Sequence, residues 1–348
     1  MTSIDTTLVK NVPLRSRAGR TRFALLLTLS SVVGAGTEAF AEMDGVVAGS
    51  AAAVKLTPTD SSTRYSLPWQ LRPVTIGNGV GIESAAAAFN DPNGNLDAAV
   101  ATVLSASYRI SEEWTPMIRL AFVGNDAPGA AVDGSSFANP VVGVTYSRKL
   151  GSYRLALFGA TTIPVGTGGG DNPNLRAART NTASMTARPA DSAMFQVNYL
   201  TEIAGVDFAY VNHGLTAQAE ATLQQSVRVR GSHSADATDL FRTNAAVGLH
   251  VGTFIGSHVS VGSDLRYQRW LSHPTGVDRA TGMHTPYSEA EMDTATAAIG
   301  VRLHFRLGQR AWIRPGISYA RGLDARGLDA PLITAQTNAA QVDIPVTF

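Results

Sequence analysis

Charged side chains recur inside segments that otherwise alternate between apolar and small or polar residues. In the set below, basic members outnumber acidic ones. On one shared face they would create a polar surface with a mildly positive potential, which attracts anions. The alternative is that guanidinium groups pair with carboxylates across that face and fill it. The set comprises Arg109, Arg119, Lys149, Arg154, Glu220, Arg228, Asp264, Arg266, Arg302 and Arg314.

Motifs for covalent, metal or nucleotide chemistry are missing from the sequence, so we predict no enzyme activity and no cofactor. The chain has no cysteine, which excludes a thiolate ligand or nucleophile. The histidines form no HExxH zinc pair, no GxSxG elbow occurs, and "GTGGGDN" lacks the Lys-Ser/Thr of a phosphate loop. A calcium loop at "DPNGNLD" and a loop-borne hydrolase at "GSHSAD" (Ser232, His233, Asp236) are the alternatives to two plain polar loops.

The overall charge is nearly balanced, with 28 basic and 27 acidic residues. This balance excludes a nucleic-acid partner bound through a basic surface. The hydrophobic fraction of 44% is ordinary for a globular chain. Neither number identifies a partner. The arrangement of segments along the chain is more informative.

The first residues have the layout of a secretory signal peptide. A basic region from Lys10 to Arg22 precedes the apolar run "FALLLTLSSVVGAG", and "AFA" at residues 39–41 offers a cleavage site. A membrane anchor is the alternative, but the run is shorter than the about 20 residues a spanning helix needs. We therefore predict a signal peptide at 1–41, a poorly structured leader at 42–70 and one all-β domain at 71–348.

From about Leu71 onward the sequence repeats segments in which every second residue is apolar, the pattern of half-buried strands. "AVATVLSASYRI" and "TATAAIGVRLHFR" are clear examples. The predicted strands begin near Pro73, Ala98, Trp114, Pro140, Tyr153, Val206, Leu215, Thr243, His258, Asp293, Ala311 and Ala340.

The connections between these segments alternate strictly between tight links such as "KLGS" and "NHG" and long polar stretches. An up-and-down sheet with short turns at one rim and long loops at the other produces this order. Outer-membrane barrels of Gram-negative bacteria have these features, and closure of the sheet leaves no unpaired edge in lipid. We predict a transmembrane antiparallel up-and-down β-barrel of about twelve strands, with a secreted β-sandwich or solenoid as the soluble alternative.

Aromatic residues gather near the ends of the predicted strands, as two girdles at the membrane interfaces require. Core packing near strand ends is the alternative explanation. Trp114, Tyr146, Tyr153, Phe254, Phe305 and Trp312 lie near short turns, and Phe122, Tyr267 and Tyr319 lie near long loops.

The last segment, "AAQVDIPVTF", alternates cleanly and ends on an aromatic residue. If it closes the barrel against the first strand, its apolar face points to lipid. The ending also resembles the signal by which the outer-membrane assembly machinery recognises barrels. Pro345 cannot donate a ladder hydrogen bond and predicts a bulge or a weak seam. The residues that carry the expected signal are Val342, Ile344, Val346 and Phe348.

On every predicted strand, the face opposite to the apolar one lines the interior of the barrel. It contains the charged residues named above, from Arg109 to Arg314. Inward glycines, such as Gly248 and Gly300, leave room and favour an open pore. The alternative is a barrel plugged by ion pairs, because barrels of eight strands are filled by side chains and 16–18 leave a channel. The longest loop, residues 165–204, either folds inward to narrow the passage or lies on the surface.

The stretch "NPVVGVTYSRKLGSYRLALFGATTIPVGTGGGDNP" resembles a hairpin of porin-like outer-membrane proteins, in particular the family associated with the meta-pathway of phenol degradation. The resemblance implies a barrel and small hydrophobic solutes, and it assigns no binding residue. From all these features we predict a passive pore for small solutes. Its partners are the lipid bilayer and the assembly machinery. The alternative is a closed structural or adhesion barrel whose outer loops carry the function.

Overall fold

The computed structural model describes residues 64–74, 77–90, 96–126, 134–232, 240–272, 275–277, 284–286, 293–309, 311–323 and 337–348. Twelve long strands form its main sheet. They are β1 (Gly79–Asn90), β2 (Leu96–Ser107), β3 (Trp114–Asp126), β5 (Val141–Leu150), β6 (Tyr153–Thr162), β7 (Tyr199–Asn212), β8 (Leu215–Arg228), β9 (Phe241–Ile255), β10 (Val259–Trp270), β13 (Thr294–Leu303), β16 (Gly316–Gly322) and β17 (Asn338–Thr347).

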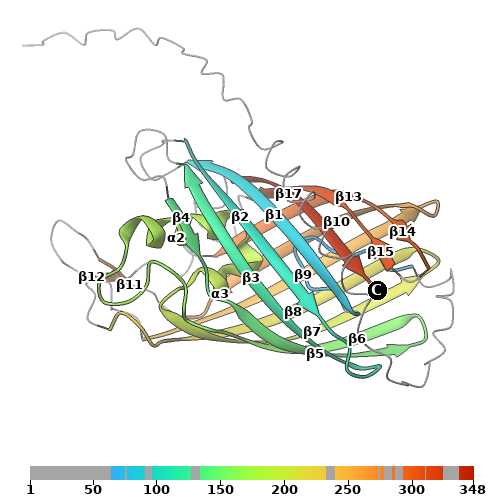
Figure 1. Ribbon diagram of the computed structural model, residues 1–348, viewed down its shortest axis with the longest axis horizontal. Helices are drawn as coiled ribbons and strands as arrows, with labels where there is room; N and C mark the ends of the chain where they lie inside the picture. Colours follow the sequence, from blue (N-terminus) through green and yellow to red (C-terminus); the bar gives the residue numbers. More distant parts are fainter. Residues whose placement is uncertain are drawn as a thin grey trace, which may run out of the picture. The chain divides into compact units, whose positions relative to one another are not determined.

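The strands pair antiparallel in chain order, and β17 pairs with β1, so the sheet closes into a barrel (Figure 1). The closing register runs without a break from Gly79 opposite Thr347 to Ala88 opposite Asn338. The predicted fold class and the expected strand count of about twelve are therefore confirmed. Closure satisfies the backbone groups that an open edge would leave unpaired in lipid.

Short turns and long connections alternate around the barrel as the sequence predicts. His213 and Gly214 both have positive φ, 48° and 86°, which suits a two-residue hairpin turn between twisted strands. Two predicted starts differ from the structure: the first strand begins at Gly79 rather than near Pro73, and β7 begins at Tyr199 rather than near Val206. Residues 199–204, expected in the long loop, alternate in burial like the rest of β7.

Shorter strands and helices lie in the connections between the long strands. A small strand pairs with β3, a two-strand hairpin lies between β10 and β13, and another hairpin lies between β13 and β16. Helices occur between β6 and β7, and no helix in the described part of the chain is both long and apolar enough to cross a bilayer. These elements are β4 (Gly134–Phe137), β11 (Thr275–Val277), β12 (His284–Pro286), β14 (Phe305–Leu307), β15 (Ala311–Ile313), α2 (Leu175–Ala187), η3 (Pro189–Asp191) and α3 (Ser192–Phe195).

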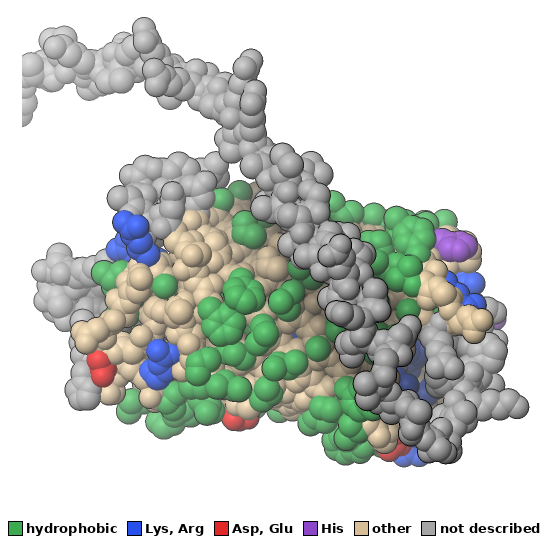
Figure 2. All heavy atoms as spheres, in the orientation of Figure 1, with side chains coloured by type: hydrophobic (Ala, Val, Ile, Leu, Met, Phe, Trp, Pro, Cys, Tyr) green, Lys and Arg blue, Asp and Glu red, His purple; other side chains and the backbone are tan. Residues whose placement is uncertain are grey.

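The two faces of each strand have opposite chemistry. In β8 and β9, apolar residues such as Leu223 and Leu249 are exposed on the outside, Leu249 at 56%. The alternate residues, including Gln218 and His250, are buried inside the barrel. Apolar side chains cover much of the outer wall in Figure 2. A polar interior inside an apolar wall is the arrangement that a lipid environment requires.

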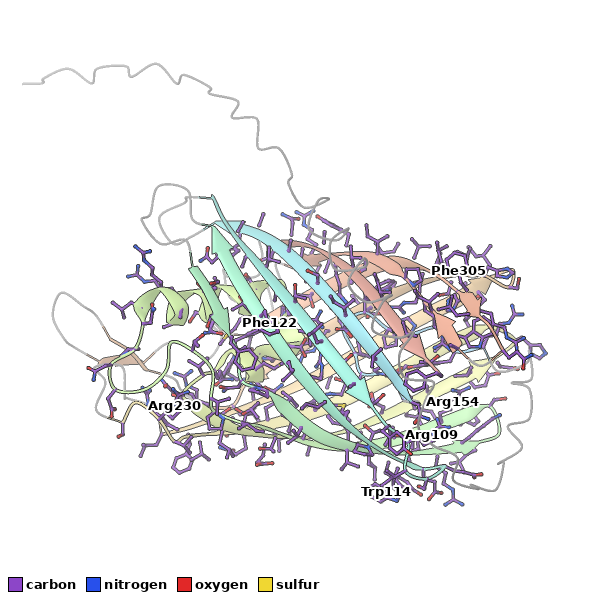
Figure 3. The ribbon with its side chains drawn as sticks, viewed as in Figure 1. Arg109, Trp114, Phe122, Arg154, Arg230 and Phe305 are labelled. Carbon is purple, nitrogen blue, oxygen red and sulfur yellow. The ribbon has the colours of Figure 1, made fainter. Side chains whose placement is uncertain are left out.

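Most of the expected aromatic residues near the strand ends lie on the outside at both rims, but Phe254 and Trp312 do not. Trp312 lies opposite Thr347, on the other face of β15 from the outward Ile313. Trp114 and Phe305 are exposed toward the end with short turns, while Phe122 lies further toward the other end (Figure 3). Phe254 instead faces inward, where its ring packs on His304 at 4.6 Å between centroids. Its even position in β9 places it on the polar face, so core packing explains this residue better than a girdle does.

Pro345 lies beside a break in one of the two seams of β17. On the β1 side, Pro345 lies opposite Gly81 within a continuous register. On the other side, the pairing with β16 ends at Asp343 and resumes with β15 at Val346. Across this gap the backbone N–H of Arg314 donates to the Pro345 carbonyl at 3.0 Å. The weakened seam expected from Pro345 therefore lies where the pairing of β17 passes from β16 to β15.

Candidate functional site

Residues 64–74, here called the lumen plug, lie inside the barrel. The plug straddles the boundary at residue 70 that the sequence suggested between leader and barrel. Near its start, the Arg64 guanidinium donates to the Gly256 carbonyl of the short β9–β10 turn at 2.9 Å. Further along, Trp69 is 7% exposed and its backbone N–H donates to an inward carboxylate of β10. The plug therefore enters from the end with short turns.

Buried carboxylates of the barrel wall hold the plug through its backbone. Asp264 Oδ2 accepts from the N–H groups of Trp69 and Gln70 at 2.6 and 2.7 Å. Its other oxygen contacts His250 Nδ1 at 2.6 Å. Glu220 Oε2 accepts from the Arg72 N–H at 2.6 Å. Hydrogen bonds to charged acceptors are the strong ones, so these two acidic residues fix the path of the plug.

Inward glycines of the wall accommodate the side chains of the plug. A Cβ at Gly300 would lie 2.4 Å from the Trp69 ring, and one at Gly316 would be equally close. A Cβ at Gly248 would lie 2.9 Å from Leu71. The prediction that these glycines leave room for an open pore is therefore wrong, because side chains of the plug occupy that room.

The connection between β6 and β7, residues 163–198, folds into the lumen from the opposite rim and is here called the inner loop. Its α3 residues Met194 and Phe195 are almost fully buried, in a cluster with Ala101 and Val103 of the β2 inner face. The helix α2 starts at the cap residue Asn174, whose side chain accepts from two backbone N–H groups of the first turn. Of the two alternatives for residues 165–204, the inward fold is the observed one.

Ion pairs anchor the inner loop to the barrel wall. Asp191 accepts from Arg119 of β3 at 2.5 Å and from Arg188 of the loop at 2.6 Å. Arg188 also pairs with Glu83 of β1. Burial alone would raise the pKa of the Asp191 carboxyl, but the two guanidinium groups outweigh burial and hold that pKa well below its usual range. Asp191 therefore stays ionised throughout the neutral range.

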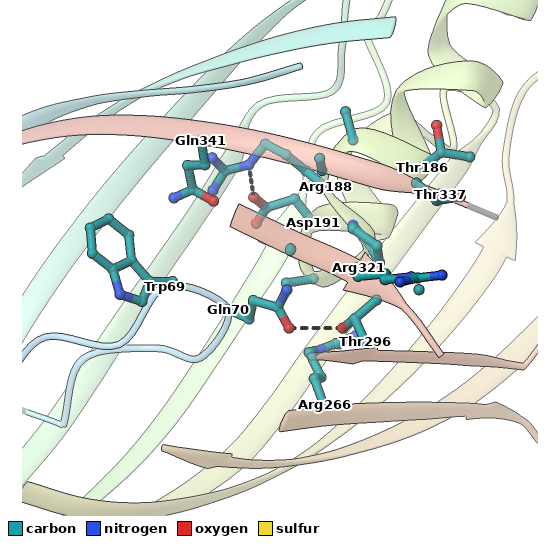
Figure 4. A pocket seen from close by; sticks show the side chains of 16 residues that line it. Trp69, Gln70, Thr186, Arg188, Asp191, Arg266, Thr296, Arg321, Thr337 and Gln341 are labelled. Carbon is teal, nitrogen blue, oxygen red and sulfur yellow. Dashed lines mark hydrogen bonds and ion pairs between the residues drawn. The ribbon is translucent and has the colours of Figure 1, made fainter. Parts of the chain in front are cut away.

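A cavity of about 180 Å³, here called the lumen chamber, lies between the plug and the inner loop. Five arginines and four carboxylates line it together with apolar groups of Trp69, Leu71 and Met117. The charged lining residues are Arg72, Arg119, Arg188, Arg266, Arg302, Glu83, Asp191, Glu220 and Asp343. A smaller cavity of about 40 Å³ adjoins Trp69, Arg188 and Arg266 (Figure 4).

No protein-family model and no curated protein sequence matches the chain. Among solved structures, an outer membrane channel from Pseudomonas putida F1 is similar, with 10% identity, coverage of 84% of this chain and 100% of that chain, and a TM-score of 0.50. The NanC porin is similar with 13% identity, coverage of 77% and 98%, and a TM-score of 0.45. The fold is that of a Gram-negative outer-membrane β-barrel.

Within this outer-membrane barrel, the predicted lining residues fall into three groups. Arg119, Glu220, Arg266 and Arg302 line the lumen chamber. Asp264 is fully buried beneath the plug, and Arg154 lies 5.4 Å from the ring of Tyr65. The remaining residues lie toward the rims or seams rather than at the chamber: Arg109 and Lys149 are exposed at the short-turn end, Arg228 donates to Arg230 and Gly231 carbonyls, and Arg314 lies at the seam of β17.

The interior residues that the sequence did not single out belong to the plug and the inner loop. Trp69, Leu71, Arg188 and Asp191 lie in segments without strand periodicity, so no alternation assigns them a face. One signal was available: "YSLPWQLRP" carries aromatic and apolar residues within an otherwise small and polar leader. Their burial depends on barrel residues far away in the chain.

Other chemistry finds no support in the described residues. No group of three or more His, Asp or Glu side chains there could hold a metal ion. The "DPNGNLD" segment lies largely outside the described residues, as do His233 and Asp236 of "GSHSAD".

Proposed function

We propose that the chain forms a passive outer-membrane pore for small solutes. The observation that supports this proposal is the lumen chamber, a cavity of about 180 Å³ lined by charged residues inside a closed barrel. Solutes would enter past the inner loop, cross the chamber and leave past the plug. No bond is made or broken in this function, and the barrel acts by size and charge alone.

The charge of the interior would give the pore a mild preference for anions. The chamber is lined by five arginines against four carboxylates. Several of these groups are paired, as in the contact of Arg302 with Asp343. Pairing weakens the local field, so we expect modest rather than strict selectivity.

Conductance of the refolded chain in a planar lipid bilayer tests the proposal. We expect stable stepwise currents, with a reversal potential in a salt gradient that indicates anion preference. A barrel verified by its heat-dependent migration on a gel, yet silent at all voltages, would contradict an open channel. Cation preference would contradict only the charge argument.

A second candidate is a closed structural or adhesion barrel whose outer loops carry the function. The observation that favours it is the filling of the lumen by the plug and the inner loop, both held by buried charges. Such a barrel would not conduct even after removal of the plug. Conductance that appears only in plug variants would instead favour a gated pore.

Two further expectations complete the proposal. Residues 1–41 would direct export and be removed, and lie outside the described residues. The C-terminal residues would bind the assembly machinery before the barrel closes. Val342, Ile344 and Val346 alternate with inward residues of β17, and Phe348 is exposed. Substitution of Phe348 by a polar residue should lower the amount of assembled barrel in cells.

A further inference from the structure

Arg266 is a buried cation of the lumen chamber that makes no anionic contact with the described residues. It points inward from β10, it is 5% exposed, and it lines both cavities. Its Nη1 donates to the neutral side chain of Gln268 at 3.0 Å. Its Nε is buried and meets no hydrogen-bond partner within the described residues. Buried charges in proteins are normally paired with an opposite charge, whereas this guanidinium has only a neutral partner within the described part of the chain.

The carboxylates that act on Arg266 electrostatically are already occupied. They are Glu220 and Asp191, while Arg72 repels it. Glu220 accepts from the Arg72 backbone N–H through Oε2 and from the Thr222 hydroxyl through Oε1. Asp191 gives its two oxygens to the arginines that anchor the inner loop. Neither carboxylate forms an ion pair with Arg266.

The lining of the chamber as a whole carries a net positive charge, like Arg266 itself. Five arginines face four carboxylates, an excess of one positive charge. Asp207 lies outside the lining, opposite Glu220 in the strand register, and its Oδ1 accepts from Gln218 at 3.1 Å. A single negative charge in the chamber would therefore complete the pairing of Arg266.

The size and the remaining lining of the chamber restrict what can carry that charge. A cavity of about 150 Å³ holds one benzene molecule, and the chamber has about 180 Å³. Trp69, Leu71 and Met117 add apolar surface beside the arginines. A planar carboxylate matches the donor geometry of a guanidinium, and an apolar body would lie against the other lining groups.

We propose that the lumen chamber binds one small organic monocarboxylate, with a body about the size of a benzene ring, through Arg266. The inference deepens the proposed pore function, on which it rests, by naming the class of solute. Figure 4 shows Arg266 on the side of the cavity formed by Gln70 and Thr296, with Arg188 and Asp191 of the inner loop across from it.

Isothermal titration of the folded full chain in detergent tests the site with benzoate, and benzyl alcohol serves as an uncharged probe of similar shape. We expect benzoate to bind at least about tenfold more tightly than benzyl alcohol, because only benzoate neutralises Arg266. Arg266→Gln should weaken benzoate binding at least about tenfold and leave benzyl alcohol unchanged. Arg266→Lys keeps the charge and should recover part of the loss.

Arg148→Gln is the matched control, since it removes one arginine from an exposed position of β5 and should not alter benzoate binding. Equal binding of benzoate to the wild type and to Arg266→Gln would overturn the inference. Equal binding of the two probes to the wild type would also overturn it, and that comparison needs no variant to fold. Loss of binding in Arg148→Gln would indicate a diffuse field rather than this site and would overturn it as well.

The conductance experiment separates this inference from the proposed function. Stable currents without benzoate binding would refute the carboxylate site and leave the pore intact. Benzoate binding in a barrel that stays silent in the bilayer would refute the pore and leave the site intact. With both functions present, benzoate should reduce the chloride current of the wild type and have no effect on Arg266→Gln.

Discussion

At the scale of single residues, the interior depends on a few buried carboxylates whose oxygens are all used. Asp264 is fully buried, and it accepts from two backbone N–H groups of the plug and contacts His250. Asp191 connects the inner loop to β3. Removal of one partner from such a contact leaves the others buried and unsatisfied, which costs more than the contact itself contributes.

Asp264→Ala should lower the free energy of unfolding by about 2–4 kcal/mol, because Trp69, Gln70 and His250 would all lose an acceptor. Urea unfolding of the barrel in detergent measures the change. Ser263→Ala, at the exposed neighbouring position, is the control and should change little. A loss no larger than that of the control would show that the plug is held by other contacts.

Asp191→Asn should lower the melting temperature at pH 7, because Arg119 and Arg188 lose their shared anion. The folded pKa of Asp191 lies below the unfolded value of about 3.9. Its stabilisation is therefore complete above that unfolded value and disappears as the pH falls through the lower folded pKa. The difference from wild type should stay constant from pH 8 to about 5 and shrink below about 4.

Thermal melts at several pH values, followed by circular dichroism, measure this difference. Glu112→Gln, in an exposed short turn, is the control for the loss of one carboxylate. A difference that grows as the solution is acidified would contradict the assignment of Asp191 as the ionised anchor.

At the scale of elements, two segments without strand periodicity decide whether the lumen is open. The plug occupies the wall near β8, β9, β10 and β13, and the inner loop occupies the wall of β1, β2 and β3. Both elements line the lumen chamber and the smaller cavity beside it. We expect movement of either element to widen the passage, so each is a candidate gate.

Replacement of residues 64–74 by a Gly/Ser sequence of the same length should raise single-channel conductance severalfold. The Trp69 ring and the Leu71 side chain would no longer fill the space above Gly300 and Gly248. Planar bilayer recordings at a fixed salt concentration measure the change. Unaltered conductance in a barrel that still shows heat-dependent migration would mean that current does not pass the plug.

At the scale of the whole molecule, the barrel separates an apolar outer wall from a polar interior. Leu249 is exposed near the middle of β9, and Thr253 is exposed nearer to the short-turn rim. Depth in the bilayer should therefore decide what a charge on the outer wall costs.

Leu249→Arg should destabilise the barrel in lipid vesicles by about 2–4 kcal/mol, whereas Thr253→Arg should cost about 0–1 kcal/mol. Reversible unfolding by guanidinium chloride in vesicles measures both. Equal costs at the two positions would place β9 differently in the bilayer. Equal costs near zero would contradict a lipid-facing outer wall.

The barrel could be predicted from the sequence without the structure. A period of two, the alternation of short and long connections and an even number of segments are local properties, so they can be read without knowledge of distant contacts. The same periodicity correctly assigned faces, as for Leu249 outside and Asp264 inside. The weakened seam near Pro345 followed from a missing backbone donor.

The contents of the interior could not be predicted, because they depend on contacts between residues far apart in the chain. Trp69 and Asp264 are 195 residues apart, and Ser66 and Thr216 are 150 apart. No periodicity within residues 64–74 or 163–198 reveals such partners, because irregular segments take their conformation from the wall on which they pack. The fold therefore follows from the alternating strands, whereas the plug, the inner loop and the chamber between them follow from contacts that exist only once the barrel has closed.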